Sequence, residues 1–137
     1  MEQHQYLSDK EFEEQFETCQ MNPSIFSHEA HLRLGWIHVK KYGELKASEN
    51  VCKQILKFDQ RHGDGNKFHK TLTMASVKVV NHFYQKSTSE TFQDFMTEFP
   101  RLKTNFKDLI DQHYGFDIYN SLEARKTYLA PDLLAFS

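Results

Sequence analysis

The chain has 137 residues, which is enough for one domain with a single sizeable core. Lysine and arginine number 17 against 19 acidic residues, so no basic excess attracts a phosphate backbone and we expect no nucleic-acid partner. With only 5 glycines and 3 prolines but 12 phenylalanines, the composition disfavours turn-rich β architectures and favours an all-α fold.

The N-terminus lacks the basic region and apolar run of a secretory signal. No window contains the roughly 18 apolar residues that a membrane span needs, so we expect no membrane partner. Cys19 and Cys52 stand alone in apolar helical patterns, which is typical of packed, reduced thiols. These features predict a cytoplasmic protein.

The first two predicted helices have recognisable ends. Residues 1–6 are polar and are expected to be disordered. Ser8 and Glu11 form a capping-box pattern that predicts a helix reaching about residue 20. Ser27 is a typical N-cap for a second helix, which should end at Gly43.

Further helical patterns follow with short connectors between them. They lie at about 44–61, 68–85, 92–99, 106–114 and 121–125. Short connections place successive helices side by side in opposite directions. The sequence therefore predicts an all-α protein, a single compact antiparallel bundle of about five or six helices in one domain over residues 1–137.

Three histidines are the sharpest candidates for a functional site. His28 and His31 are three residues apart and share one face of the second helix, while His69 opens the fourth helical pattern. If these helices pack side by side, the three imidazoles can converge. Imidazole suits zinc, iron and nickel, so one divalent transition metal with His28, His31 and His69 as ligands is a hypothesis. A metal-free site and plain packing remain alternatives.

Other residues of the helical patterns are expected to have roles in the fold and not in a site. Glu29 should face away from the histidine stripe, as a first-turn carboxylate. Gly35 costs a helix interior roughly 1 kcal/mol relative to alanine, so we expect a neighbouring helix to pack closely there. Three further histidines lie next to charges or loops and are expected to be exposed: His38, His62 and His82.

A second group of polar candidates lies near the C-terminus. Tyr114 could donate a hydrogen bond to a reacting oxygen, and Arg125 could bind a carboxylate or phosphate with its planar fork. An ion pair of Arg125 with Asp132 is the structural alternative. Because the segment 114–131 is too apolar to leave in water, we expect it to fold back over the histidine site.

Several motifs occur in a recognisable order. They are Phe26-Ser27-His28-x-x-His31-Leu32-Arg33, Phe68-His69-x-Thr71-x-Thr73 and Ser121-x-x-Ala124-Arg125 with Pro131-Asp132. Over about residues 7–132 the chain resembles a family of small bacterial all-α proteins whose activity is not established. The resemblance implies a common fold and common histidine positions, but no reaction. Phe68 and Lys70 stand where that family often has tyrosine and glutamate.

Three functions are compatible with these residues. The first is a small metal-dependent enzyme for hydrolysis or a related small-molecule conversion, with Tyr114 or Arg125 facing the substrate. The second is a metal-free binding module for an anionic small molecule. The third is an interaction protein in which the histidines only pack.

Overall fold

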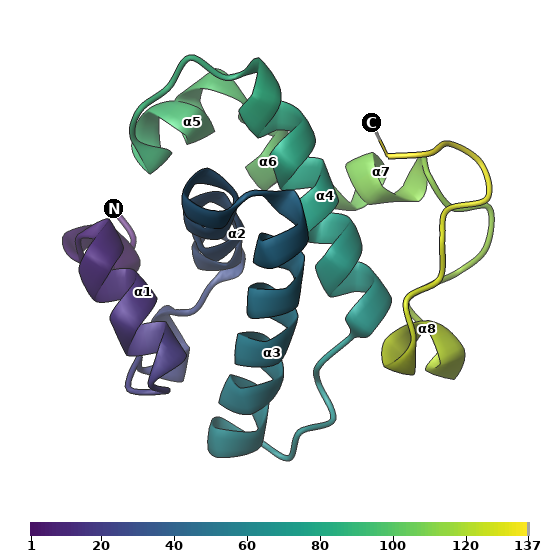
Figure 1. Ribbon diagram of the computed structural model, residues 1–137, viewed down its shortest axis with the longest axis horizontal. Coiled ribbons are helices and arrows are strands. Elements are labelled where there is room, and N and C mark those ends of the chain that lie inside the picture. The colour runs from purple at the N-terminus through teal and green to yellow at the C-terminus, as the bar shows by residue number, and fades with distance from the viewer. Residues whose placement is uncertain (137) are drawn as a thin grey trace.

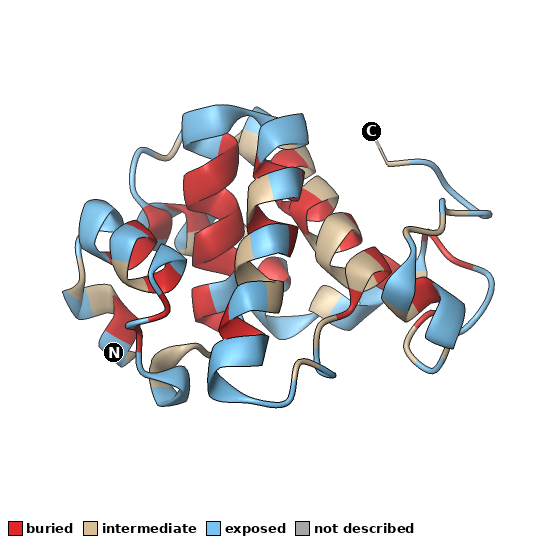
Figure 2. Ribbon diagram, turned by 60° about the horizontal axis from the view of Figure 1, so that its bottom comes forward, coloured by how far each residue is buried: buried red, intermediate tan, exposed pale blue. Residues whose placement is uncertain are grey.

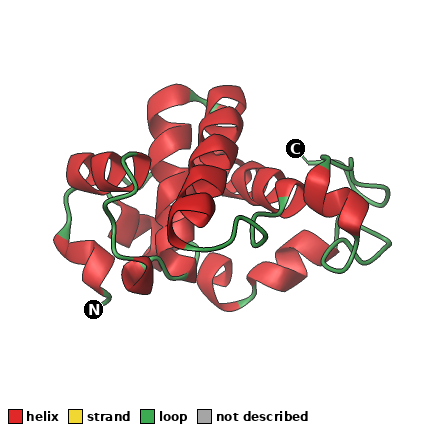
Figure 3. Ribbon diagram, turned by 90° about the horizontal axis from the view of Figure 1, so that it is seen from below, coloured by secondary structure: helices red, strands yellow, loops and turns green. Residues whose placement is uncertain are grey.

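Helices are the only regular structure in residues 1–136, which the computed structural model describes (Figure 3). The all-α fold is therefore confirmed. There are more helices than expected, because the C-terminal half is divided into short pieces. None of the helices in the described part of the chain combines the length and the apolar character of a membrane span. In order, they are η1 (Gln3–Tyr6), α1 (Asp9–Glu17), η2 (Pro23–Ile25), α2 (His28–Tyr42), α3 (Glu44–His62), α4 (Lys70–Lys86), α5 (Phe92–Glu98), α6 (Arg101–Thr104), α7 (Phe106–Asp111) and α8 (Leu122–Lys126).

The ends of the first helices are set by local hydrogen bonds. The Glu11 N–H donates to Ser8 Oγ at 3.1 Å and the Ser8 N–H donates to the Glu11 carboxylate at 2.9 Å, which confirms the capping box. Ser27 Oγ accepts the Ala30 N–H at the start of α2. Gly43 has φ +82°, which favours glycine, and this turn lets α3 begin at the next residue.

Helix α2 is the centre of the molecule. It packs against α3 and α4 and also contacts α1 and α6. In Figure 1 it is seen nearly end-on, whereas α3 and α4 run across the view in opposite directions, joined by the loop 63–69. Figure 2 shows that the central helices carry most of the buried residues. The largest fully buried side chains include Trp36, Phe12, Phe16 and Phe95.

The N-terminal segment is ordered, which contradicts the expectation that residues 1–6 are disordered. Gln3–Tyr6 form a 3-10 turn and the side chain of His4 is 0% exposed. The cause lies on α2, where the buried side chains of Glu29 and Arg33 need partners. Arg33 donates to the His4 carbonyl oxygen at 2.5 Å and to the Leu7 carbonyl oxygen at 2.7 Å. The segment is held by groups distant in sequence.

Glu29 accepts hydrogen bonds from three donors. They are His4 Nε2 at 2.5 Å, Gln5 Nε2 at 2.8 Å and the Lys103 ammonium at 3.1 Å. Burial raises the pKa of the Glu29 carboxyl, but the hydrogen bonds from Gln5, Lys103 and His4 outweigh it and hold this pKa below 4.5. The charged form of Glu29 is thus the one that the fold stabilises.

Three histidines were expected to be exposed, and the structure agrees for one of them. His38 is buried and not exposed, because its side of α2 is covered: Asn50 lies 3.4 Å from its Nδ1 and the Tyr42 ring packs on it. Burial lowers the pKa of His38. His62 is exposed as expected, whereas His82 is half-buried.

The C-terminal segment folds back onto the start of α4. It was expected to cover the three histidines, but of residues 114–131 only Tyr119 lines the cavity that those histidines share. Thr71 Oγ1 donates to the Thr127 carbonyl oxygen at 2.8 Å and accepts the Leu129 N–H at 3.0 Å. The Tyr114 hydroxyl donates to the Leu129 carbonyl oxygen at 2.9 Å. These bonds dock α8 beside the start of α4.

Replacing Glu29 by glutamine tests the buried network. Glu29→Gln should lower the free energy of unfolding by about 1–3 kcal/mol near neutral pH, because it removes a charged acceptor from three donors. The folded-state pKa is lowered, so this stabilisation is present above pH 4.5 and is lost as the pH falls through the folded-state pKa. Urea unfolding of the wild type and of Glu29→Gln, from neutral pH down through the folded-state pKa, measures this. The difference between their free energies of unfolding should become smaller as the pH falls. Glu14→Gln, at an exposed site on α1, is the control. A pH-independent difference would contradict the account.

Gly35 faces Val80 of α4, but the two helices do not approach so closely there that glycine is required. A Cβ added at Gly35 would lie 3.7 Å from Val80 Cγ2, an ordinary contact distance. Gly35→Ala should therefore fit and raise the free energy of unfolding by about 0.5–1 kcal/mol through helix propensity. Thermal melting is the measurement, and a lowered Tm would show that the helices must approach more closely.

Candidate functional site

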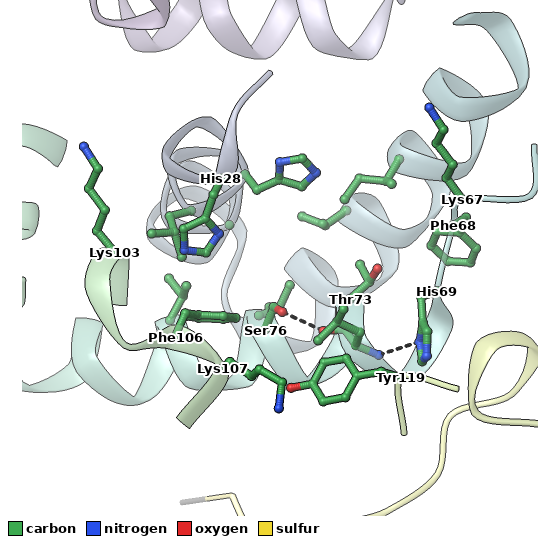
Figure 4. Close-up of a pocket in the computed structure, with 18 of the residues that line it drawn as sticks. His28, Lys67, Phe68, His69, Thr73, Ser76, Lys103, Phe106, Lys107 and Tyr119 are labelled. Carbon is green, nitrogen blue, oxygen red and sulfur yellow. Dashed lines mark hydrogen bonds between the residues drawn. The ribbon is translucent and has the colours of Figure 1, made fainter. Parts of the chain in front are cut away.

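A cavity of about 700 Å³ lies between α2, α3, α4, α6, α7 and the loop 63–69. Its apolar wall comes mainly from α2, α3 and α4, and its other residues are mostly polar or aromatic (Figure 4). The polar lining residues are His28, His31, Lys67, His69, Thr73, Ser76, Lys103, Thr104, Lys107 and Tyr119. No aspartate or glutamate is among the lining residues of the described chain.

All three predicted histidines line this cavity, but they do not form one cluster of ligands. In Figure 4 His28 and His69 lie on opposite sides of the cavity. Within residues 1–136, the nitrogens of His28, His31 and His69 are not among the groups of three potential ligand atoms that lie within 4.8 Å of one another. The structure therefore brings the three residues to one cavity without assembling a three-histidine centre.

His69 has a structural role at the start of α4. Its Nδ1 accepts the Leu72 N–H at 3.0 Å, so the side chain caps the helix, and its Nε2–H donates to the Ile118 carbonyl oxygen at 2.8 Å. A ring that accepts at one nitrogen and donates at the other is neutral, with both nitrogens occupied. Ligation by His69 would cost one of these bonds.

Within residues 1–136, His28 and His31 each have a hydrogen-bond partner at one ring nitrogen only. His28 Nε2–H donates to the Leu102 carbonyl oxygen at 3.1 Å, and His31 Nδ1–H donates to the Ser27 carbonyl oxygen at 2.8 Å. The His31 ring stacks on Phe26 with centroids 3.7 Å apart. Desolvation by the surrounding protein lowers the pKa of His31, the Ser27 carbonyl raises it, and His28 lowers it further. His31 is thus favoured in its neutral form.

A separate group of potential ligands lies in the N-terminal network. Atoms of Glu2, His4 and Glu29 approach within 4.8 Å of one another. The donors His4, Gln5 and Lys103 already satisfy Glu29, and Ser27 Oγ donates to Glu2. This arrangement holds the N-terminal segment against α2 and α6.

Tyr114 and Arg125, the predicted catalytic residues, are not among the cavity-lining residues. The Tyr114 hydroxyl is bonded to the Leu129 carbonyl oxygen, and burial raises its pKa. The Arg125 guanidinium donates to the carbonyl oxygens of Asn66 and Lys67 at 3.0 and 3.3 Å. Asp132, its proposed ion-pair partner, instead accepts the Gly115 N–H. Arg125 thus fixes the loop beside the cavity.

The sequence interpretation missed several lining residues, among them three lysines and a tyrosine. Lys67, Lys103, Lys107 and Tyr119 line the cavity from segments without a motif, and Figure 4 shows the lysine ammonium groups at its edge, pointing outward. Lys107 lies 4.8 Å above the Tyr119 ring, whose hydroxyl donates to Asp111 at 2.9 Å. Burial and Asp111 raise the pKa of Tyr119. No local pattern in the sequence marks these residues as cavity-lining, because the tertiary fold brings their segments together.

The capping role of His69 can be tested with two substitutions. His69→Ala should lower the free energy of unfolding by about 1 kcal/mol more than His69→Asn, because asparagine also accepts the N–H bond at an N-cap. Both variants lose the bond to Ile118, so their comparison isolates the cap. Urea unfolding measures the difference, and equal losses would contradict the capping role.

Three comparisons with known proteins were made, with family models, curated sequences and solved structures. None finds a match. The motif resemblance described above thus stays a prediction, and a role for the cavity has to be inferred from the charges, hydrogen bonds and shape of its own residues.

Proposed function

We propose that the cavity binds a small organic anion with an apolar body. The observation that carries this proposal is the lining itself: three lysines and three histidines, no carboxylate, and a wall of aliphatic and aromatic side chains within the described residues. Ligand sites are typically mostly apolar with a few polar groups that fix orientation, and about 300–1,000 Å³ is their usual size. The volume of about 700 Å³ falls in that range.

The three lysines of the cavity differ in whether their ammonium groups already have an ion-pair partner. The Lys103 ammonium is shared with Glu29 at 3.1 Å, and the Lys107 ammonium lies 2.6 Å from Asp111. The Lys67 ammonium makes no ion pair with any described residue within 4.0 Å. An entering anion can therefore bind Lys67 without displacing a protein carboxylate.

Lys67 is also held in place from its backbone. The N–H groups of Lys67 and Phe68 donate to Asp59 Oδ2 at 2.8 and 3.0 Å, and Arg125 donates to the carbonyl oxygens of this loop. A loop ordered before binding loses little conformational freedom when a ligand enters. Lys67 is therefore the best-prepared anion contact.

The apolar wall defines the remainder of the ligand. Leu32, Val51, Ile55, Leu72 and Val80 face the cavity, with Phe68 and Phe106 at its sides. Burying a hydrocarbon chain or ring against these side chains is favourable by roughly 25 cal/mol per Å². A medium-length or aromatic carboxylate, or a phosphate monoester of similar size, combines the negative charge and the apolar body that this lining would bind.

A matched pair of ligands tests the proposal. Octanoate and octanol share their chain and differ in charge, and both can be titrated calorimetrically in the presence of EDTA. Octanoate should bind more tightly than octanol to the wild-type chain. Lys67→Gln should weaken octanoate about two- to fivefold, the range for an exposed charge contact, and leave octanol unchanged.

Two further variants complete the experiment. Lys53→Gln removes an exposed lysine of α3 that does not line the cavity, and it should change neither affinity. Thr73→Phe fills the cavity and should weaken both ligands. Equal affinities for octanoate and octanol, or an unchanged octanoate affinity in Lys67→Gln, would refute anion binding at this site.

A further inference from the structure

Four side-chain hydroxyl groups line the cavity within the described residues, and three of them already donate to the protein. The hydroxyls of Ser76 and Thr104 donate to the carbonyl oxygens four residues earlier, at 2.6 and 3.2 Å. The Tyr119 hydroxyl donates to a carboxylate at 2.9 Å. The fourth hydroxyl belongs to Thr73 and has no hydrogen-bond partner among residues 1–136.

This lack of a partner is unusual for a threonine inside a helix. Serine and threonine side chains in helices can donate to the carbonyl oxygen four residues earlier, and Thr18 and Thr97 also do so, at 2.8 and 3.1 Å. The corresponding carbonyl oxygen for Thr73 is that of His69. It accepts the Thr73 N–H at 3.0 Å but not the hydroxyl. The Thr73 hydroxyl is thus turned away from the backbone of its own helix.

The Thr73 hydroxyl is also accessible from the cavity. Thr73 is half-buried and lines the cavity, and in Figure 4 its hydroxyl points away from Tyr119, toward the space between the lining side chains. Its oxygen is not among the fully enclosed polar atoms without a partner, which in the described chain belong to Arg33, Trp36, His38, Ser48 and Gln54. Solvent that enters the cavity can therefore satisfy this hydroxyl.

A ligand with a purely apolar body would remove that solvent. The aliphatic lining around Thr73 includes Leu32, Leu72 and Val80, so a hydrocarbon packed against it leaves the hydroxyl without a partner. An unpaired polar group in a filled site is unfavourable, and a ligand oxygen at this position accepts the hydrogen bond instead.

We infer that Thr73 determines specificity and that the ligand is an organic anion whose apolar body carries a hydroxyl or carbonyl oxygen. The inference rests on the proposed binding of an organic anion in this cavity and adds the class of ligand. The position of the oxygen along the ligand is set by the distance between the anion contact and Thr73.

Calorimetric titration with octanoate and three hydroxyoctanoates is the test, with the hydroxyl near the carboxylate, at mid-chain or at the chain end. Selectivity is the affinity for a hydroxyoctanoate divided by that for octanoate. Thr73→Val replaces the hydroxyl with a methyl group. It should lower the selectivity for at least one isomer about two- to tenfold, the range for one hydrogen bond. Thr97→Val makes the same exchange at an exposed position outside the cavity and should leave every selectivity unchanged.

The other outcomes identify which proposal fails. Unchanged selectivity for all three isomers in Thr73→Val would overturn the inference, and if all affinities fell equally, Thr73 would contact the carboxylate instead. Octanoate binding in that case would leave the anion proposal standing. Failure of all four compounds to bind the wild-type chain would overturn both proposals. Because selectivity compares ligands on one variant, a partial loss of folded protein, checked by circular dichroism, does not change it.

Discussion

The structure depends on the near-complete burial of helix α2. From Glu29 to Val39 all residues except His31 are buried, including the charged residues Glu29 and Arg33. Buried charges are tolerated when hydrogen-bonded partners replace water. This requirement orders the N-terminal segment, fixes Lys103 of α6 against Glu29 and leaves His28 and His31 as the exposed residues at the open end of the helix. One helix thus connects the stability of the fold to the cavity.

The cavity is shaped by backbone hydrogen bonds made by charged and polar side chains. Arg125 holds the loop 66–68, His69 caps α4, and carbonyl oxygens select the tautomers of the two histidines on α2. Each contact joins segments that are distant in sequence or fixes a ring within a helix turn. The cavity therefore has polar groups set in orientation before any ligand enters, which favours recognition of a defined small molecule.

Local signals in the sequence predicted the parts of the fold that local interactions determine. Ser8, Ser27 and Gly43 set helix ends through contacts within four residues, and these were correctly predicted. The order of residues 1–6 could not be predicted, because it depends on Glu29 and Arg33 about 25 residues away. His69 was correctly placed near a helix start and at the cavity, but its two backbone bonds require the tertiary structure. Arg125 has no carboxylate four residues before it, and this indicated that its partner comes from another part of the chain. The sequence did not reveal that the partners are backbone carbonyl oxygens.

The protonation pattern of the three histidines is the central claim, because it separates one structural ring from two rings with free lone pairs. Long-range ¹H–¹⁵N correlation spectra of the imidazoles, with ring signals assigned by single substitutions, measure this pattern directly. Near neutral pH and without metal, the protonated nitrogen should be Nε2 in His28 and His69 and Nδ1 in His31. Protonation of His69 at Nδ1, or of His28 and His31 at the opposite nitrogens, would contradict the account.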